Sequence, residues 1–189
     1  LYQYGWEACA PLHSFGPYVR NHYLFHYIIS GQGRLESNDQ KGATRKYQLG
    51  ADQGFLISPG QVNTYYAHES DPWKYVWLEF DGLRVAEHLD QAGLDIVQPV
   101  YQPQSPELGQ AVRDSMLYIA CHPDQTALHL IGHLCLFLDG LVQSSSSRRR
   151  QHGGQLRDFY IQEAVTFMEN NYAREITVEE LASVCKLNR

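Results

Sequence analysis

Residues 20–33 read RNHYLFHYIISGQG, an aromatic and β-branched run that ends in a Gly-x-Gly turn. Aromatic and β-branched side chains favour strands, and glycines allow the tight turn that joins two of them. Shorter runs of the same kind follow at 34–37, 45–49, 55–57, 63–67 and 73–80. Many short strands at close spacing predict an antiparallel sandwich or barrel in this half of the chain.

The pattern becomes helical after Gly82. We expect a short helix over 83–91, one more strand over 96–101, and a helix from Pro106 to Cys121. Ser105 precedes that proline, and a serine cap followed by proline is typical of a helix start. Over 126–142 apolar residues recur at spacings of three and four, which predicts an amphipathic helix. Residues 177–180 read TVEE, a capping box that predicts another helix over 178–185.

Composition and charge limit the class of protein. The chain has 189 residues, 43% of them hydrophobic, and a net charge of −6. An acidic chain is a poor nucleic-acid binder by itself, and no apolar run approaches the roughly 20 residues of a membrane span. The four cysteines are widely spaced and predict buried, reduced thiols in a cytoplasmic protein. Because the chain starts LYQYG, we expect a trimmed protein without a signal peptide.

A change of composition predicts the domain organisation. Residues 144–154 read SSSSRRRQHGG, a low-complexity segment typical of a hinge. We expect a ligand-binding barrel over 1–102, a helical dimerisation segment over 103–143, a flexible linker over 144–155, and the start of a second helical domain over 156–189.

The chain resembles the AraC/XylS-type transcriptional regulators, and among them the sugar-responsive members. The resemblance rests on residues 20–33, on GFLISPGQVN (54–63), on DPWKYVWLEF (71–80) and on ITVEELA (176–182). It implies a cupin-like jelly-roll barrel for the ligand, helices for dimerisation, and a helix-turn-helix DNA-binding domain that is cut short here. Reading DNA requires a helix in the major groove, so we expect operator binding only in the full-length protein.

Cupin barrels also house metal-dependent enzymes, which makes an enzyme an alternative. Similarity to metal cupins places Leu24 and Asn63 where a glutamate and a histidine ligand would stand, and neither residue anchors a divalent ion well. The pair His22 and His26 shares one strand face, and His129 with His133 lacks a third ligand. We therefore expect no metal, no cofactor and no catalytic residue. A non-sensing interaction module is the other alternative.

Strand alternation selects a candidate ligand site. Tyr75, Trp77 and Glu79 share one strand face, and Val76, Leu78 and Phe80 share the other, which should pack on helices. Rings beside a carboxylate suit a sugar, which stacks on aromatic faces while polar groups take its hydroxyls. The resemblance implies sugar contacts from Arg20, Tyr65 and Trp77. With the residues that share their faces, the predicted ligand set is Arg20, His26, Asn63, Tyr65, Tyr75, Trp77 and Glu79.

The helix over 126–142 also carries a candidate interface. Its stripe has the spacing that joins two helices in a seam. We predict a homodimer interface at Ile131, Leu134, Leu138 and Leu141. The alternative is that these residues pack within the monomer.

Overall fold

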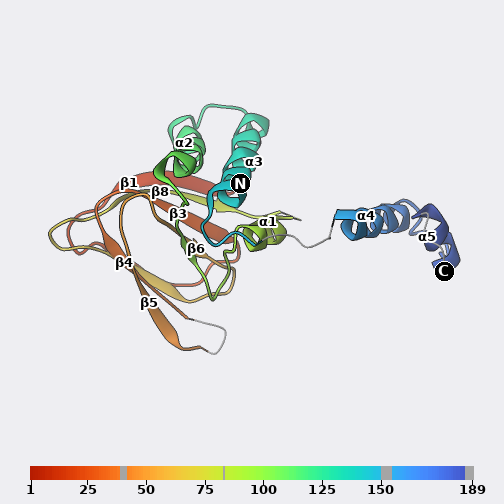
Figure 1. Cartoon of the computed structure of the whole chain (residues 1–189), viewed down its shortest axis with the longest axis horizontal. Coiled ribbons are helices and arrows are strands. Elements are labelled where there is room, and N and C mark those ends of the chain that lie inside the picture. The colour runs from red at the N-terminus through yellow and green to blue at the C-terminus, as the bar shows by residue number, and fades with distance from the viewer. Residues whose placement is uncertain (39–41, 83, 150–154, 186–189) are drawn as a thin grey trace. The chain divides into compact units, whose positions relative to one another are not determined.

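A computed structural model describes residues 1–38, 42–82, 84–149 and 155–185. The chain divides into two compact units, Leu1–Arg149 and Arg150–Arg189 (Figure 1). The first unit holds nine strands and three helices among its described residues, and the second holds two helices.

Two antiparallel sheets form the barrel of the first unit. The five-stranded sheet has the order β1 (Gln3–Ala8), β8 (Lys74–Phe80), β3 (Tyr23–Ser30), β6 (Gly54–Ile57) and β9 (Val100–Tyr101). The four-stranded sheet has the order β2 (Ser14–Tyr18), β7 (Asn63–Ala67), β4 (Gly33–Asn38) and β5 (Thr44–Leu49). The expected cupin-like jelly roll is therefore confirmed.

Alternate side chains of both sheets fill the barrel interior. One buried cluster takes Leu24, Ile28, Phe55, Ile57 and Tyr75 from the five-stranded sheet, and Leu35, Leu49, Tyr65 and Ala67 from the other. Side chains that interdigitate from two facing sheets make the core of such a fold.

The outer face of the five-stranded sheet is covered by helices α2 (Pro106–Cys121) and α3 (Ala127–Ser144) (Figure 1). Helix α1 (Val85–Gln91) adds Val85 and Leu89 to the same core. The expected alternation along β8 is confirmed, because Val76, Leu78 and Phe80 all pack in this outer core. One face of strand β8 thus points into the barrel interior, and the other face packs against the helices.

The predicted helix starts are confirmed by their caps. The Ser105 hydroxyl accepts a hydrogen bond from the Leu108 amide, and helix α2 begins at Pro106. In the second unit, α4 (Gln155–Asn170) precedes α5 (Val178–Val184). The Glu180 amide donates to the Thr177 hydroxyl at 3.2 Å, and the Thr177 amide donates to the Glu180 carboxylate at 3.1 Å, which completes the capping box.

The structure shortens one predicted strand and adds two that the sequence did not predict. The strand expected over 96–101 is confined to Val100–Tyr101. The Asp95 carboxylate accepts the Val97 and Gln98 amides at 2.7 and 2.8 Å, and these bonds hold the backbone in a turn. Strands β1 and β2 are not among the predicted strands, because Gly5 interrupts the first short run and Gly16 and Pro17 interrupt the second.

The first unit continues into the segment expected to be the linker. Ser144 ends α3, and Ser145 is buried and bridges to Pro103. The Arg149 guanidinium pairs with Asp90 and Asp95. Residues 144–149 therefore pack on the barrel, whereas residues 150–154 of the expected linker lie outside the described residues.

Candidate functional site

An ion pair lies at the end of the barrel where β3 begins. The Arg20 guanidinium donates to Glu79 Oε2 at 2.9 Å, and His22 Nδ1 lies 3.2 Å from Glu79 Oε1. Glu79 reaches this place because it is the penultimate residue of β8 and pairs in register with Leu24 of β3. Both partners of the Arg20–Glu79 pair are mostly buried, so water screens their attraction less than at an open surface.

Aromatic rings surround the guanidinium of this pair. Arg20 lies over the rings of Phe15 and Tyr18, with 5.5 and 5.2 Å to their centroids. Phe15 in turn stacks on Tyr65, with ring centroids 5.4 Å apart. Rings from β2 and β7 therefore continue the site across the barrel to the four-stranded sheet.

Trp77 lies on the inner face of β8, half-buried between two strands. It pairs in register with His26 on β3 and with Gly5 on β1. A Cβ at Gly5 would lie 3.2 Å from the Trp77 ring, so the glycine lets β1 pass closely beside the indole. The ring is thereby held between its neighbours.

A buried ring cluster, formed by His26, Phe55, Tyr65 and Tyr75, lies next to Trp77. The imidazole stacks on Phe55 at 4.4 Å and meets Tyr65 and Tyr75 edge to face at 4.9 and 4.8 Å between centroids. Burial, with a smaller effect of the nearby Arg20 charge, lowers the pKa of His26 to about 3. The imidazole is therefore neutral at physiological pH, and its Nδ1 has no hydrogen-bond partner among the described protein atoms.

The two tyrosines of the ring cluster are also neutral. Burial is the main cause that raises the pKa of each phenol well above its ordinary value. The Tyr75 hydroxyl donates to Glu7 Oε2 at 3.1 Å. Neutral phenols can both donate and accept hydrogen bonds inside the barrel.

Asn63 has a structural role in addition to its predicted contact with the ligand. Its Nδ2 donates to the carbonyls of Tyr18 and Gln61 at 3.1 and 3.2 Å, which braces the start of β7. Its buried Oδ1 has no partner among the described protein atoms. The side chain therefore keeps one acceptor for another contact.

The structure places the predicted ligand set around the barrel interior. Five members (Arg20, His26, Tyr65, Tyr75 and Glu79) are linked through the ion pair and the ring contacts just described. Trp77 lies in register with His26, and Asn63 lies nearby on β7. The prediction missed Phe15, Tyr18 and His22. Part of the signal is in the sequence, because Phe15 and Tyr18 stand five and two positions before Arg20, but without a strand there the sequence does not show where their rings point.

The residues considered as metal ligands lie in separate places. Leu24 is buried in the apolar interior. His22 stacks on Tyr2 at 3.7 Å, whereas His26 belongs to the ring cluster. The rings of His129 and His133 are 5.2 Å apart on α3, beside Tyr118. Within the described residues, a potential three-ligand group is formed elsewhere, by Glu7, Cys9 and His13.

An open hollow of about 330 Å³ lies outside the predicted site. It is lined by Leu12, Gly33, Arg34, Gln48, Tyr66, Ala67, His68, Glu69 and Ser70, none of which belongs to the predicted ligand set.

Three of the four residues of the predicted dimer interface pack within the monomer, which was the alternative left open for this helix. Leu134, Leu138 and Leu141 are buried in the core between α3 and the barrel, whereas Ile131 is 45% exposed. Helix α3 is long and apolar enough to cross a membrane, yet this packing makes it a core helix of the unit. Most of the predicted stripe lies on the helix face that meets the barrel, and the opposite face carries the exposed apolar side chains.

Comparison with known proteins connects the site to a family. Residues 1–156 match the model of the AraC-like ligand binding domain. The Msm operon regulatory protein of Streptococcus mutans is 25% identical over 189 residues, which cover 98% of this chain and 66% of that protein. The raffinose operon transcriptional regulatory protein RafR of Pediococcus pentosaceus is 28% identical over 193 residues, with the same two shares.

A solved structure shares the fold. Apo ToxT from Vibrio cholerae, crystallised as a point variant, superposes with a TM-score of 0.53 at 9% identity, over 98% of this chain and 70% of that one. The chain spans 66% of the length of these two operon regulators, just under two thirds.

Proposed function

The chain belongs to the AraC-like ligand-binding domain family, and from this premise we propose that it is the ligand-sensing and dimerisation part of a regulator of sugar-utilisation genes. The barrel binds a mono- or oligosaccharide, and the bound sugar controls DNA binding by the full-length protein. The names of the relatives support a sugar-operon role. As these relatives are regulatory proteins, we propose a cytoplasmic sensor without catalytic activity.

The observation that carries the proposal is the combination of rings and polar groups inside the barrel. Trp77 offers an aromatic face beside the Arg20–Glu79 pair, at 2.9 Å between its charged atoms. His26 Nδ1 and Asn63 Oδ1 add buried polar atoms that have no partner among the described protein atoms. A sugar has apolar C–H faces and many hydroxyls, and it would satisfy both kinds of group.

Strand β8 offers a route from the ligand to the helices. Trp77 and Glu79 face the barrel interior, and the alternate residues Val76 and Leu78 pack in the core with α2 and α3. If a bound sugar displaces the inner-face residues of β8, the outer-face residues that contact the helices move with them, because packed cores transmit displacement.

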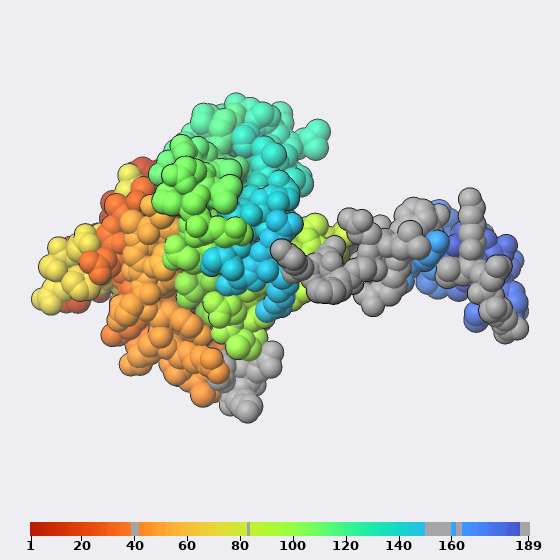
Figure 2. All heavy atoms as spheres, in the orientation of Figure 1, coloured from red at the N-terminus to blue at the C-terminus, as the bar shows by residue number. Residues whose placement is uncertain are grey.

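The exposed face of α3 is the proposed dimer surface. Leu128, Ile131, Cys135 and Leu136 are exposed along this face, and Figure 2 shows α3 (teal) at the surface of the first unit. Exposed apolar patches mark interaction surfaces, and most soluble oligomers are symmetric homodimers. The start of the DNA-binding domain at α4 and α5 completes the proposed organisation.

A thermal-shift screen against mono- and disaccharides tests the sensor proposal. Binding to the folded state stabilises it by about 2.7 kcal/mol when the ligand is at a hundredfold excess over Kd. We expect at least one sugar to raise Tm. A screen in which no sugar raises Tm would contradict the proposal.

Trp77→Ala tests the site itself. It should keep the fold and cost about 1–3 kcal/mol of sugar affinity, the scale of a buried ring contact. Trp6→Ala is the matched control, since Trp6 is 52% exposed on the neighbouring strand β1. Sugar affinity measured by calorimetry should fall in the first variant only. Equal affinities in both variants would exclude Trp77 from the site.

A further inference from the structure

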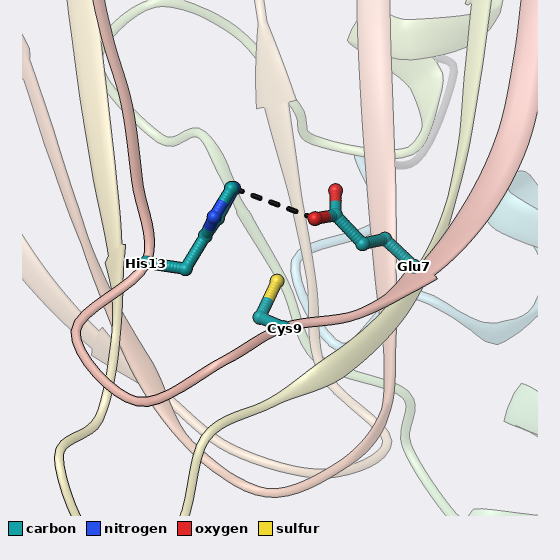
Figure 3. A group of neighbouring side chains, drawn as sticks. All are labelled: Glu7, Cys9 and His13. Carbon is teal, nitrogen blue, oxygen red and sulfur yellow. Dashed lines mark ion pairs between the residues drawn. The ribbon is translucent and has the colours of Figure 1, made fainter.

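A second group of functional side chains lies at the other end of the β1–β8 ladder from Glu79. The turn cluster consists of Glu7 on β1, Cys9 just after β1, and His13 just before β2. One donor atom of each residue lies within 4.8 Å of the donor atoms of the other two. Figure 3 shows the imidazole, the thiol and the carboxylate pointing into one region.

The backbone around the turn cluster is fixed at both ends. The Cys9 amide donates to the Trp73 carbonyl at 3.1 Å, and the Ala67 amide donates to the His13 carbonyl at 2.8 Å. Within the turn, the His13 amide donates to the Ala10 carbonyl at 3.1 Å. The three side chains are therefore presented from backbone that neighbouring segments hold in place.

The Glu7 carboxylate is oriented by a neighbour outside the turn cluster. Its Oε2 accepts the hydrogen bond from the Tyr75 hydroxyl at 3.1 Å, and its Oε1 lies 3.5 Å from His13 Nε2. Metal-binding carboxylates are commonly held in this way by a hydrogen bond to the oxygen that does not bind the metal.

We propose that Glu7, Cys9 and His13 form a binding site for a zinc-class divalent cation. Thiolate, imidazole and carboxylate are zinc ligands, and a site with three protein ligands leaves the fourth tetrahedral position to water. Tetrahedral zinc bonds place ligand atoms about 3.3–3.6 Å apart. The distance of 3.5 Å between His13 Nε2 and Glu7 Oε1 already meets this requirement. The donor atoms of the turn cluster are at most 4.8 Å apart, so a movement of about 1 Å brings the most distant one to the spacing that zinc requires.

A cation in this place would join the two sheets. Glu7 belongs to the five-stranded sheet, and His13 leads directly into β2 of the four-stranded sheet. Binding to the folded state alone raises its stability. The test is independent of the sugar proposal, because cation binding is measured without sugar.

The test is a titration of the metal-free chain with Zn²⁺, followed by Co²⁺ as a spectroscopic probe. The reference protein carries Cys121→Ser and Cys135→Ser, because both thiols are exposed and can bind metal without a built site. We expect one equivalent of Zn²⁺, a raised Tm, and a thiolate-to-cobalt charge-transfer band.

Three variants assign the ligands. Cys9→Ser should abolish the charge-transfer band, and His13→Gln should weaken Zn²⁺ binding by roughly tenfold or more. His133→Gln is the matched control for the histidine pair on α3 and should bind as the reference does. His13 is half-exposed in a turn, so its variant should fold even if the buried Cys9 position does not tolerate serine.

Two results would overturn the proposal. One is a folded reference protein, checked by circular dichroism, that binds no stoichiometric Zn²⁺. The other is binding that survives unchanged in His13→Gln or that is lost in His133→Gln.

Discussion

Glu79 is shared by two basic side chains, because its Oε2 accepts from Arg20 and its Oε1 lies 3.2 Å from His22 Nδ1. The sequence motif placed Arg20 and Glu79 in one site, and strand alternation gave the correct face of Glu79. The sequence could not show that Arg20 and Glu79 form an ion pair, since the two residues are 59 positions apart along the chain. Contacts of this kind depend on the register between β3 and β8.

Glu79→Gln should destabilise the fold by about 1–3 kcal/mol, because it leaves a mostly buried guanidinium without its charged partner. The matched change Glu36→Gln removes ion pairs to Arg34 and Lys46, which are far more exposed, and should cost less than about 1 kcal/mol. Urea unfolding of both variants measures the difference. Equal losses would show that the Arg20–Glu79 pair behaves as a surface pair.

His26 should make stability depend on pH. Its pKa is about 3 in the folded protein and near 6.5 in an unfolded chain, where the imidazole is in water. Below pH 6.5 the His26 imidazole binds a proton in the unfolded chain but not in the folded protein. The free energy of unfolding therefore falls as the pH drops, by about 1.4 kcal/mol per pH unit, until the pH approaches 3.

His26→Phe should remove this part of the pH dependence while keeping the ring contacts to Phe55 and Tyr65. The same change at exposed His68 should leave the pH dependence as it is. Urea denaturation at pH 7 and pH 5 measures the slope for each variant. An unchanged slope in His26→Phe would mean that another group causes the acid sensitivity.

At the scale of an element, α3 shows where sequence periodicity stops being informative. The spacing of its apolar residues predicted the helix and one buried stripe. The helix is apolar on both sides, however, so the pattern could not tell which side meets the barrel. Packing against Val76, Leu78 and Phe80 of β8 decides this, and it buries Leu134, Leu138 and Leu141.

Two leucines of α3 give opposite predictions for the same substitution. Leu138 is 8% exposed, so Leu138→Lys places a charge in the core and should lower the free energy of unfolding by about 3 kcal/mol or more. Leu136 is 57% exposed, so Leu136→Lys should keep the fold and convert the proposed dimer into a monomer. Analytical ultracentrifugation and thermal melts separate the two effects. A Leu136→Lys chain that still sediments as a dimer would place the interface elsewhere.

At the scale of the whole molecule, the sequence predicted the order of strands and helices from residue 22 to residue 149 well, because most of these elements begin or end at a strong local signal. Ser105, Thr126 and Thr177 all cap the helices that follow them. The site was less predictable. Phe15 and Tyr18 reach Arg20 through a strand whose glycine and proline hid it. The turn cluster joins Glu7 of β1 to Cys9 and His13 of the segment between β1 and β2, and it follows no familiar spacing.

The two sheets of the barrel differ in how they are covered, and this should divide the molecule into parts that open on different timescales. Strands β3, β6 and β8 are buried on both faces, whereas β5 is an edge strand with mostly exposed residues. Amide hydrogens in the first group should exchange with deuterium only when the whole unit unfolds, and those in β5 should exchange through local fraying. A sugar between the sheets would then be visible mainly as slowed exchange in β7 and β4. Those strands have a solvent-facing side and more room to gain protection.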